Sequence, residues 1–434
     1  MNQTTIMKHH YFIGIDRSDQ TIDICQFSSA GETLVQSKIN SAPETLLPWV
    51  DDLLAQLPDG STIALCIEQP CQNLVNFFSQ FPRISIYLAN PAVIKKYRES
   101  LSASRAKDDR RDAAAIARFV FERHARLQPY SNTDPRGHQI ATLVEKRRQL
   151  VGTRTSLTNK LTQALKDYYP QALELVGKYI YSPLSCAFLT KWSSLQDLKK
   201  ARQSTITQFY FTQRSRSTKR LNERLELIEK SVPMCSDDDL IEVYQLLVVS
   251  LVKSIRQIQR SIKNFDDLIK EKASQHQDIK IFASLPGAGP CYAARLLAFF
   301  GSDRSRYQDA SSIQKDSGVA PVTKQSGKMH FVHRRYACKK FDRQTFVEWA
   351  GQTIPKSLWA RAYYEQQKSK GHRHQSILRS LAYKWQRILF RCWKNHEPYD
   401  ENTYLKALRK ASSPLVEFID IIRTTHPGLC EKLS

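Results

Sequence analysis

The sequence YFIGIDRSDQTIDICQF, residues 11–27, contains two apolar segments that predict neighbouring strands of a sheet. Residues 11–16 form a short buried run that ends in an acid, and residues 21–27 alternate apolar and polar side chains. A turn at residues 28–31 leads to a third predicted strand over residues 33–39. Three strands in close succession predict an antiparallel arrangement at the start of the chain.

The next segments predict helices and two more strands. Ser41-Ala-Pro-Glu44 has the residues of a helix start. Apolar runs predict strands over 62–67 and 84–88, with a helix around 72–80 between them and another helix that opens at Asn90-Pro91. Three antiparallel strands, a crossover and two further strands with intervening helices is the order of the ribonuclease-H-like fold. The predicted fold class is therefore an α/β RNase-H-like (RuvC-like) amino-terminal domain.

Four carboxylates lie where this order brings chain segments together. Asp16 and Glu68 each end an apolar run, whereas Asp109 and Asp112 stand three apart at the start of a helical pattern and share one helix face. An acidic first turn that faces water is the alternative for the helical pair. Carboxylates at strand ends together with a helical pair are typical of enzymes that bind hard divalent ions.

Three further acids compete with this set. Asp23 lies within the alternation of the second strand, and Asp108 points away from the face that Asp109 and Asp112 share. These two acids and Asp19 are therefore weaker candidates.

The composition indicates a polyanionic partner. The 434 residues suffice for two or three domains, and 65 Lys+Arg against 42 Asp+Glu give a net charge of +23. No apolar run reaches the length of a membrane span, no signal peptide is apparent, and the nine cysteines form no C-x-x-C pair. We therefore expect a cytoplasmic, nucleoid-associated protein that binds nucleic acid and no membrane.

A long polar helix is predicted over residues 137–169. One nearby acid, Glu145, leaves its basic residues unbalanced, so phosphate contact is as plausible as a solvated face. The candidate phosphate ligands on this helix are Arg147, Arg148, Arg154 and Lys160. Residues 173–235 favour helix over strand, and residues 240–269 repeat apolar side chains at near-heptad spacing. An intramolecular helical hairpin and a dimerising coiled coil both account for that repeat.

The last third of the chain combines glycines, basic residues and one serine of interest. Leu285-Pro-Gly-Ala-Gly-Pro290 resembles the turn of a helix-hairpin-helix element, in which Gly287 and Gly289 allow a close approach to a phosphate. Residues 314–344 hold eight Lys/Arg and two acids, and the candidate nucleic-acid ligands are Lys324, Lys328, Arg334, Arg335, Lys339 and Lys340. Ser326, expected in a loop, is a candidate nucleophile for a phosphodiester, although most loop serines have no such role.

At these residues the chain resembles the DEDD transposases, the bridge-RNA-guided serine recombinases of insertion sequences. The amino-terminal matches are Gly14-Ile15-Asp16, Ile67-Glu68, Asn90-Pro91, Lys107-Asp-Asp109-Arg-Arg-Asp112-Ala113, and Arg154-Thr155 with Asn159 and Pro170. The carboxy-terminal matches are Leu285-Pro-Gly-Ala-Gly289, Gly318-Val-Ala-Pro321, Gln325-Ser326-Gly327 and Trp359-Ala-Arg-Ala-Tyr-Tyr364. The matches cover roughly residues 11–170 and 278–405 and occur in the family's order.

The resemblance implies a mechanism. Asp16, Glu68, Asp109 and Asp112 would bind Mg²⁺, as two ions and with Mn²⁺ as a substitute, and Ser326 would form a phosphoserine link to DNA. The partners would be donor and target double-stranded DNA, a structured non-coding guide (bridge) RNA, and further copies of the chain in a dimer or tetramer.

The resemblance also implies a domain order. We expect an RNase-H-like domain at 11–130, a helical linker and coiled coil at 131–277, a mostly helical serine-bearing domain at 278–405, and a tail at 406–434. Two other functions stay open: a RuvC-like nuclease or junction resolvase that uses water, and a non-catalytic nucleic-acid-binding protein.

Overall fold

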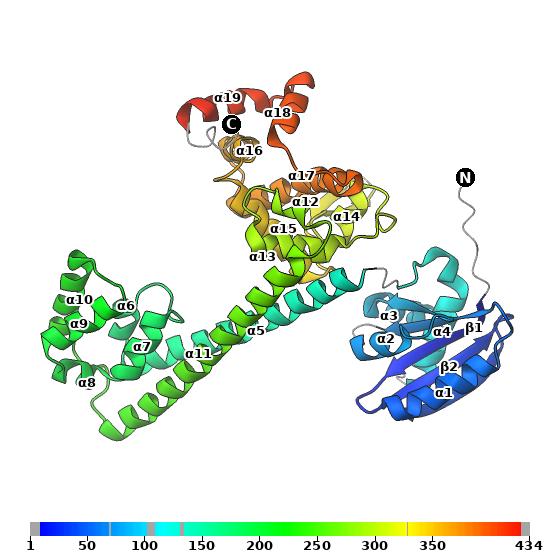
Figure 1. Cartoon of the computed structure of the whole chain (residues 1–434), viewed down its shortest axis with the longest axis horizontal. Coiled ribbons are helices and arrows are strands. Elements are labelled where there is room, and N and C mark those ends of the chain that lie inside the picture. Colours follow the sequence, from blue (N-terminus) through cyan, green and yellow to red (C-terminus); the bar gives the residue numbers. More distant parts are fainter. Residues whose placement is uncertain (1–8, 69–70, 102–108, 131–133, 328, 427–434) are drawn as a thin grey trace. The chain divides into compact units, whose positions relative to one another are not determined.

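The computed structural model describes residues 9–68, 71–101, 109–130, 134–327 and 329–426 (Figure 1). The chain forms two compact units, Met1–Thr133 and Asp134–Ser434.

The amino-terminal unit contains a five-stranded sheet, and all five predicted strands are present. The strand order is β3-β2-β1-β4-β5. Strands β1, β2 and β3 pair antiparallel, whereas β4 pairs parallel with both β1 and β5. The strands are β1 (His9–Arg17), β2 (Thr21–Ser28), β3 (Thr33–Asn40), β4 (Thr62–Glu68) and β5 (Ile84–Ala89).

Helices cover both faces of this sheet, because alternate side chains of the central strands point to opposite faces. Ile13 and Leu65 pack in one core with α1 (Pro43–Ala55) and α2 (Gln72–Phe78). Phe12 and Cys66 pack in the other core with α3 (Pro91–Leu101) and α4 (Asp109–Arg123). The helices predicted to start near Ser41, Asn90 and Asp109 are therefore confirmed, and each covers a buried sheet face.

The contact between α4 and β1 depends on Gly14. A Cβ atom at this position would lie 2.2 Å from the backbone nitrogen of Ala117 and 2.3 Å from the carbonyl oxygen of Ala113. No side chain fits between the two backbones. The small residue at this point in β1 therefore sets how closely the first turns of α4 approach the strand.

The second unit is mostly helical and is built on two long helices, α5 (Pro135–Tyr168) and α11 (Asp238–Ser274), which pack against each other (Figure 1). One core lies around α6 to α10, and the other lies among the helices that follow α11. The helices of the first core are α6 (Gln171–Leu175), α7 (Pro183–Lys191), α8 (Leu195–Lys200), α9 (Gln203–Thr212) and α10 (Thr218–Lys230). Residues 173–235 are thus helical, as expected.

The remaining elements follow α11, and all of them except a short exposed hairpin contribute buried residues to the second core. They are α12 (Ile279–Ala283), α13 (Gly289–Phe300), α14 (Ala310–Asp316), the hairpin β6 (Val322–Ser326) and β7 (Met329–His333), α15 (Lys340–Thr353), α16 (Leu358–Ser369), α17 (His374–Asn395), α18 (Glu401–Lys410) and α19 (Leu415–Thr425). Leu415, Ile419 and Ile422 of α19 are buried in the same core as α16. None of the helices in the described ranges is long and apolar enough to span a membrane.

The intramolecular alternative for the apolar repeat is confirmed, since α11 packs on α5. The near-heptad repeat predicts that Leu240 and Leu247 belong to the buried seam. This is wrong in the first turns, where both are 44% exposed and their neighbours Ile241 and Val248 are buried. A straight helix has 3.6 residues per turn, so a stripe extrapolated at heptad spacing drifts around its surface. From Leu251 onward the predicted seam faces the core.

We predict that Gly14→Ala lowers the free energy of unfolding of the amino-terminal unit by about 1–3 kcal/mol, because the added methyl group overlaps backbone atoms that cannot move aside. Differential scanning calorimetry of the full chain measures this change.

Gly152→Ala is the matched control. Gly152 lies within α5 with no atom within 4 Å of an added Cβ, so alanine is expected to stabilise that helix by about 0.5–1 kcal/mol. An unchanged calorimetric profile for Gly14→Ala would contradict the close packing of α4 on β1.

Candidate functional site

Two of the predicted acids lie side by side at one edge of the sheet. The parallel register pairs Ile15 of β1 with Ile67 of β4, so Asp16 and Glu68 follow at neighbouring strand ends. Asp16 lies on the same strand face as Phe12 and Gly14, which face α4. Glu68 lies on the same strand face as Cys66, which points to the same side of the sheet. Both half-buried carboxylates therefore belong to the sheet face that α4 covers.

The third acid comes from α4. Asp112 is buried, with 6% of its surface exposed, and directly precedes Ala113, whose carbonyl group lies against Gly14. The first turns of α4 thus bring Asp112 toward the end of β1 that carries Asp16. Asp109 is the first residue of α4, and its side chain lies outside the described residues.

Asp112 has one charged partner and one unpaired oxygen. Its Oδ2 atom accepts an ion pair from the Arg98 guanidinium of α3. Its Oδ1 atom is buried and has no hydrogen-bond partner among the described residues. A buried acceptor without a partner costs about 1–3 kcal/mol, so this oxygen is suited to a cation or a donor from a bound molecule.

Asp23, one of the weaker candidates from the sequence, is a neighbour of Asp16 in the sheet. It is the direct cross-strand partner of Asp16, so both side chains point to the same sheet face. Asp23 is 3% exposed and forms an ion pair of 3.3 Å with Lys38 of β3. The pairing of Asp16 with Asp23 could be inferred from the sequence, because the short connection between β1 and β2 sets an antiparallel register that places the two acids opposite each other.

The acids fit a divalent ion in their chemistry. No three His, Cys, Asp or Glu side chains are close enough to hold a metal within the described residues, which exclude the Asp109 side chain. Burial, with a smaller contribution from Glu68, raises the pKa of the Cys66 thiol to about 12. This thiol stays protonated, so carboxylate oxygens are the ligand type that this edge of the sheet offers.

Ser326 is the last residue of β6 and not a loop residue as expected. It is exposed and pairs with Met329 of β7, and Gly327 turns the chain with a φ of 54°. The amino acids two positions apart in a strand share a face, so Lys324 lies on the same side of the hairpin as Ser326. A short exposed hairpin therefore presents the hydroxyl beside a cation.

The basic residues around this hairpin are mostly exposed. Arg335 is half-buried, and its Nε atom donates to the carbonyl oxygen of Ala320 at 3.3 Å. The placement of Lys328 lies outside the described residues. The exposed members of the predicted set are Lys324, Arg334, Lys339 and Lys340.

The predicted arginines of α5 make intramolecular contacts. Arg147 forms two hydrogen bonds to Asp266 of α11, at 2.5 and 3.2 Å, and Arg148 pairs with Glu145. Arg154 donates to Gln259 at 2.9 Å and stacks 4.1 Å from the ring of Tyr181. Lys160, by contrast, is exposed. The sequence around Glu145 offers too few acids to pair with the arginines of α5. Asp266 of α11, which is distant in sequence, supplies a further carboxylate partner.

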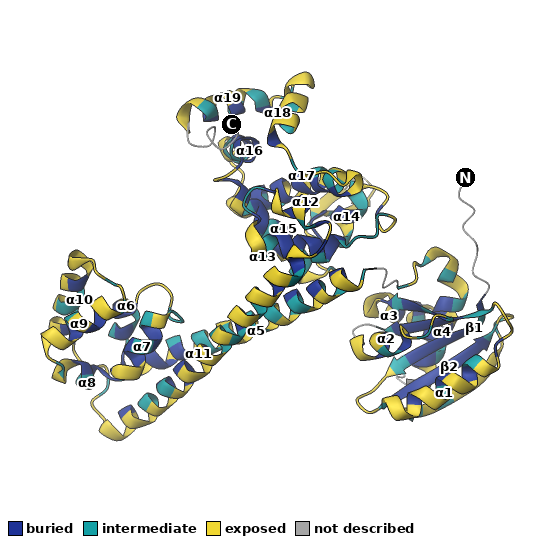
Figure 2. Ribbon diagram, in the orientation of Figure 1, coloured by how far each residue is buried: buried dark blue, intermediate teal, exposed yellow. Residues whose placement is uncertain are grey.

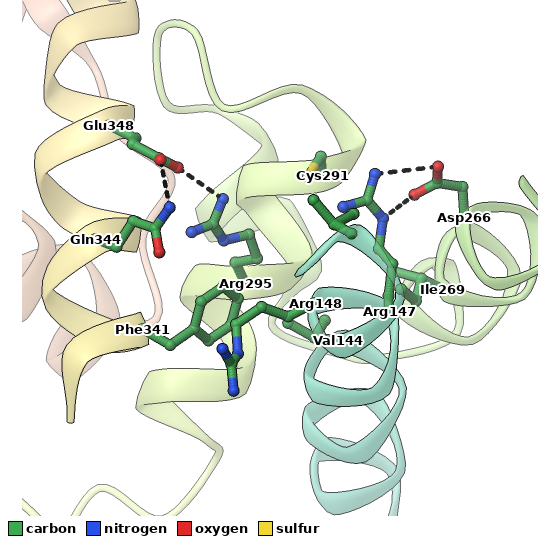
Figure 3. A pocket seen from close by; sticks show the side chains of 11 residues that line it. Val144, Arg147, Arg148, Asp266, Ile269, Cys291, Arg295, Phe341, Gln344 and Glu348 are labelled. Carbon is green, nitrogen blue, oxygen red and sulfur yellow. Dashed lines mark hydrogen bonds and ion pairs between the residues drawn. The ribbon is translucent and has the colours of Figure 1, made fainter. Parts of the chain in front are cut away.

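Arg147 and Arg148 also line a cavity of about 170 Å³ in the second unit (Figure 3). Arg295 of α13 faces the same cavity and pairs with Glu348 of α15 at 3.2 Å. Its guanidinium lies 4.6 Å from the Phe341 ring. Each arginine here has a carboxylate partner, so the cavity is a charge-balanced junction of α5, α11, α13 and α15.

The two glycines of the predicted phosphate-binding turn have different surroundings. Gly287 has a φ of 72°, and a Cβ there would lie 2.5 Å from the carbonyl oxygen of Gln352 in α15. Its close approach is therefore to the protein's own backbone. Gly289 begins α13 with a φ of 52° and open space around it.

Two family models match the chain. The model of the DEDD transposases of the IS110 type, described as "Transposase", matches residues 13–170. The model described as "Transposase IS116/IS110/IS902 family" matches residues 279–365. The first match contains all four predicted acids, and the second contains Ser326.

Relatives match most of the chain. The putative transposase of the IS117 mini-circle from Streptomyces coelicolor is 28% identical over 93% of this chain and 98% of its own length. An IS110 protein of 43.6 kDa from the same organism is 23% identical over 87% of this chain and 93% of its own length. An IS900 protein of 42 kDa from Mycobacterium paratuberculosis is 25% identical over 68% of this chain and 74% of its own length. With both domain models matched in order, the chain belongs to the IS110 family of insertion-sequence transposases.

Proposed function

We propose that this transposase cuts and rejoins DNA with the carboxylates of Asp16, Glu68, Asp109 and Asp112 and the hydroxyl group of Ser326. The observation that carries the proposal is the placement of Asp16 and Glu68 at neighbouring strand ends on the sheet face that α4 covers, together with a buried Asp112 oxygen that has no hydrogen-bond partner among the described residues. The strand order of the amino-terminal unit supports an RNase-H-like fold, in which such an edge of the sheet holds the catalytic acids.

Mg²⁺ is the cation that this oxygen-rich edge suits best. Asp16, Glu68 and Asp112 would hold it with Asp109, and Arg98 would keep one oxygen of Asp112 oriented. When bound, the ion lowers the energy of charge that develops on phosphate oxygens. The carboxylates would hold the ion, and the exposed lysines and arginines would contact the backbone of the nucleic acid.

Ser326 is the proposed nucleophile. Its Oγ atom forms a bond to phosphorus as the bond from phosphorus to one DNA oxygen breaks, and the hydroxyl proton passes to a base at the site. The leaving DNA oxygen takes up a proton from an acid at the site and becomes a hydroxyl group. Attack of a DNA hydroxyl on the phosphoserine reverses these steps and joins a new strand, so the phosphodiester energy is retained.

The proposed partners are a guide RNA and further copies of the chain. Base pairing with a structured bridge RNA would select donor and target DNA, while the protein contacts backbone and shape. The net charge of +23 and the exposed cations near Ser326 support binding to such polyanions. The carboxylates and the serine would take part in the same reaction, carried out by a dimer or tetramer.

We predict that covalent trapping separates serine chemistry from hydrolysis. The protein, its guide RNA and end-labelled DNA are incubated with Mg²⁺, denatured and separated on a gel. Label is expected to migrate with the protein, and Ser326→Ala and Asp109→Asn are each expected to reduce this adduct by more than about 1000-fold, because each removes an essential group.

Asp19→Asn is the matched control for the acids, because Asp19 is exposed in the turn after β1. It is expected to leave the adduct unchanged. Free nicked DNA without an adduct, unaltered in Ser326→Ala, would instead identify a nuclease that activates water.

We predict that metal removal separates catalysis from binding. Excess EDTA is expected to abolish strand cleavage, and added Mg²⁺ or Mn²⁺ to restore it, because the acids need a cation to act on phosphate. DNA affinity at constant ionic strength is expected to change little, since the exposed lysines and arginines carry it. Cleavage that persists in EDTA would contradict the metal assignment.

We predict that DNA affinity is strongly salt-dependent. Between about 50 and about 200 mM salt, the affinity for labelled duplex DNA should fall about 1000-fold or more, as released counterions no longer favour binding. Fluorescence anisotropy at several salt concentrations gives the slope. A flat response would show that the excess of basic residues does not contact phosphate.

A further inference from the structure

Basic residues gather in the turn that joins α9 to α10. Residues 198–222 contain seven Lys/Arg and no Asp or Glu. Four of these cations lie in the turn or in the first residues of α10, and we refer to them as the turn cations: Arg214, Arg216, Lys219 and Arg220. Exposed residues predominate in this region (Figure 2), all four cations are exposed, and none forms an ion pair with another residue in the described part of the chain. Such a cluster attracts a polyanion.

Helix stability does not account for the two turn cations on α10. Lys219 and Arg220 stand in the first turn of this helix, which holds no acidic residue. The amino-terminal end of a helix carries partial positive charge, so cations are unfavourable there and anions are stabilised. A phosphate bound at this position would be attracted by both side chains and by the helix end. The placement of these residues therefore indicates a negatively charged ligand.

An aromatic side chain lies beside these cations. Phe211 at the end of α9 is 37% exposed, whereas the two residues before it are buried in the core. It lines an open depression of about 410 Å³ together with Gln208, Thr212 and Arg216. An exposed ring offers a flat face on which a nucleobase can stack, and the Gln208 amide can donate to and accept from the edge of that base. The depression thus combines a stacking surface, a polar amide and a cation.

The turn is tied to both helices. Arg214 has a φ of 60°, and the Ser215 amide donates to the carbonyl oxygen of Tyr210 at 2.9 Å. From α10, Arg224 donates to the Ser215 hydroxyl at 3.0 Å, and its guanidinium lies 4.2 Å from the centre of the Tyr210 ring. A surface that is already ordered loses less conformational freedom when a ligand binds. The depression and the turn cations are therefore held in fixed positions relative to each other.

We propose that this turn is a binding site for single-stranded nucleic acid. One unpaired base stacks on Phe211 in the depression, and the neighbouring phosphates contact the turn cations. Bases within a duplex keep both faces against neighbouring pairs, so only an unpaired base can offer a face to Phe211. Unpaired RNA and unpaired DNA share this chemistry. The site contains none of the residues proposed for strand cleavage, so it adds a second contact with nucleic acid to the one around Ser326.

Protection of lysines from acetylation measures binding at the turn itself, whereas overall affinity includes every basic surface of the chain. The full chain is titrated with a short oligouridylate in the absence of metal ions, acetylated briefly and analysed by mass spectrometry. We expect the oligonucleotide to protect Lys219 and to leave Lys230 reactive, since Lys230 lies at the other end of α10 and is paired with Glu226. The oligonucleotide concentration that half-protects Lys219 measures the affinity of the turn.

Phe211→Leu tests the stacking, and Phe211→Tyr is its matched control. Leucine is apolar but has no aromatic face, so the half-protecting concentration is expected to rise at least about fivefold. Tyrosine keeps the ring, so this concentration is expected to stay within about twofold of the original. Arg216→Gln removes one cation from the depression and is expected to raise the concentration at least about threefold, with a weaker dependence on salt.

The same titration with an oligothymidylate and with a fully paired duplex identifies the ligand. Stronger protection by oligouridylate assigns the site to unpaired RNA, and stronger protection by oligothymidylate assigns it to unpaired DNA. Protection by the duplex at an equally low concentration would overturn the proposal. Equal reactivity of Lys219 and Lys230, or an unchanged affinity in Phe211→Leu, would do the same. Because no metal ion is present and no strand is cleaved, failure at this turn and failure of the proposed serine chemistry are separate results.

Discussion

The close contact of α4 with β1 at Gly14 determines where Asp112 lies relative to the strand end that carries Asp16. Asp16 and Glu68 are adjacent because β1 and β4 are parallel neighbours, which needs only the sheet. Asp112 joins them because α4 lies against the strand where no Cβ atom intervenes. The buried residues Ile116 and Val120 hold that helix in the core. A geometric constraint on backbone packing, and not an attraction between the acids, assembles this edge of the sheet.

The acids themselves oppose the arrangement. Asp16 and Asp23 face each other across β1 and β2, and Asp112 is buried nearby, so like charges accumulate in a region of reduced dielectric. Lys38 offsets part of this charge through Asp23, and Arg98 offsets part through Asp112. Each of these cations engages one acid at the periphery of the group. A divalent ion bound by the carboxylates would offset more of this charge, in keeping with the proposed chemistry.

Local patterns predicted the elements of this protein well, because strand alternation and helix starts are written in neighbouring residues. All five strands and the helix that begins at Asp109 could be placed from them. Contacts between distant segments could not. The partners of Arg147 and Asp112 come from α11 and α3, and the role of Gly287 depends on the backbone of α15. The apolar repeat of α11 was visible in the sequence. The face that it buries depends on the rotation of the helix against α5, and counting in heptads placed this face wrongly in the first turns.

The distribution of partnered arginines changes where nucleic acid would bind. In the middle of α5, Arg147 and Arg148 have carboxylate partners and Arg154 is held by Gln259 and Tyr181, so phosphate would have to compete with existing contacts. Lys160 and the cations around Ser326 are exposed and need no such exchange. Exposed cations without a partner gain more from a phosphate than paired ones, because no existing ion pair has to be broken. The strongest electrostatic attraction for a nucleic-acid backbone in the second unit is therefore expected around the hairpin that carries the proposed nucleophile, with α5 and α11 acting as the rigid frame that holds it.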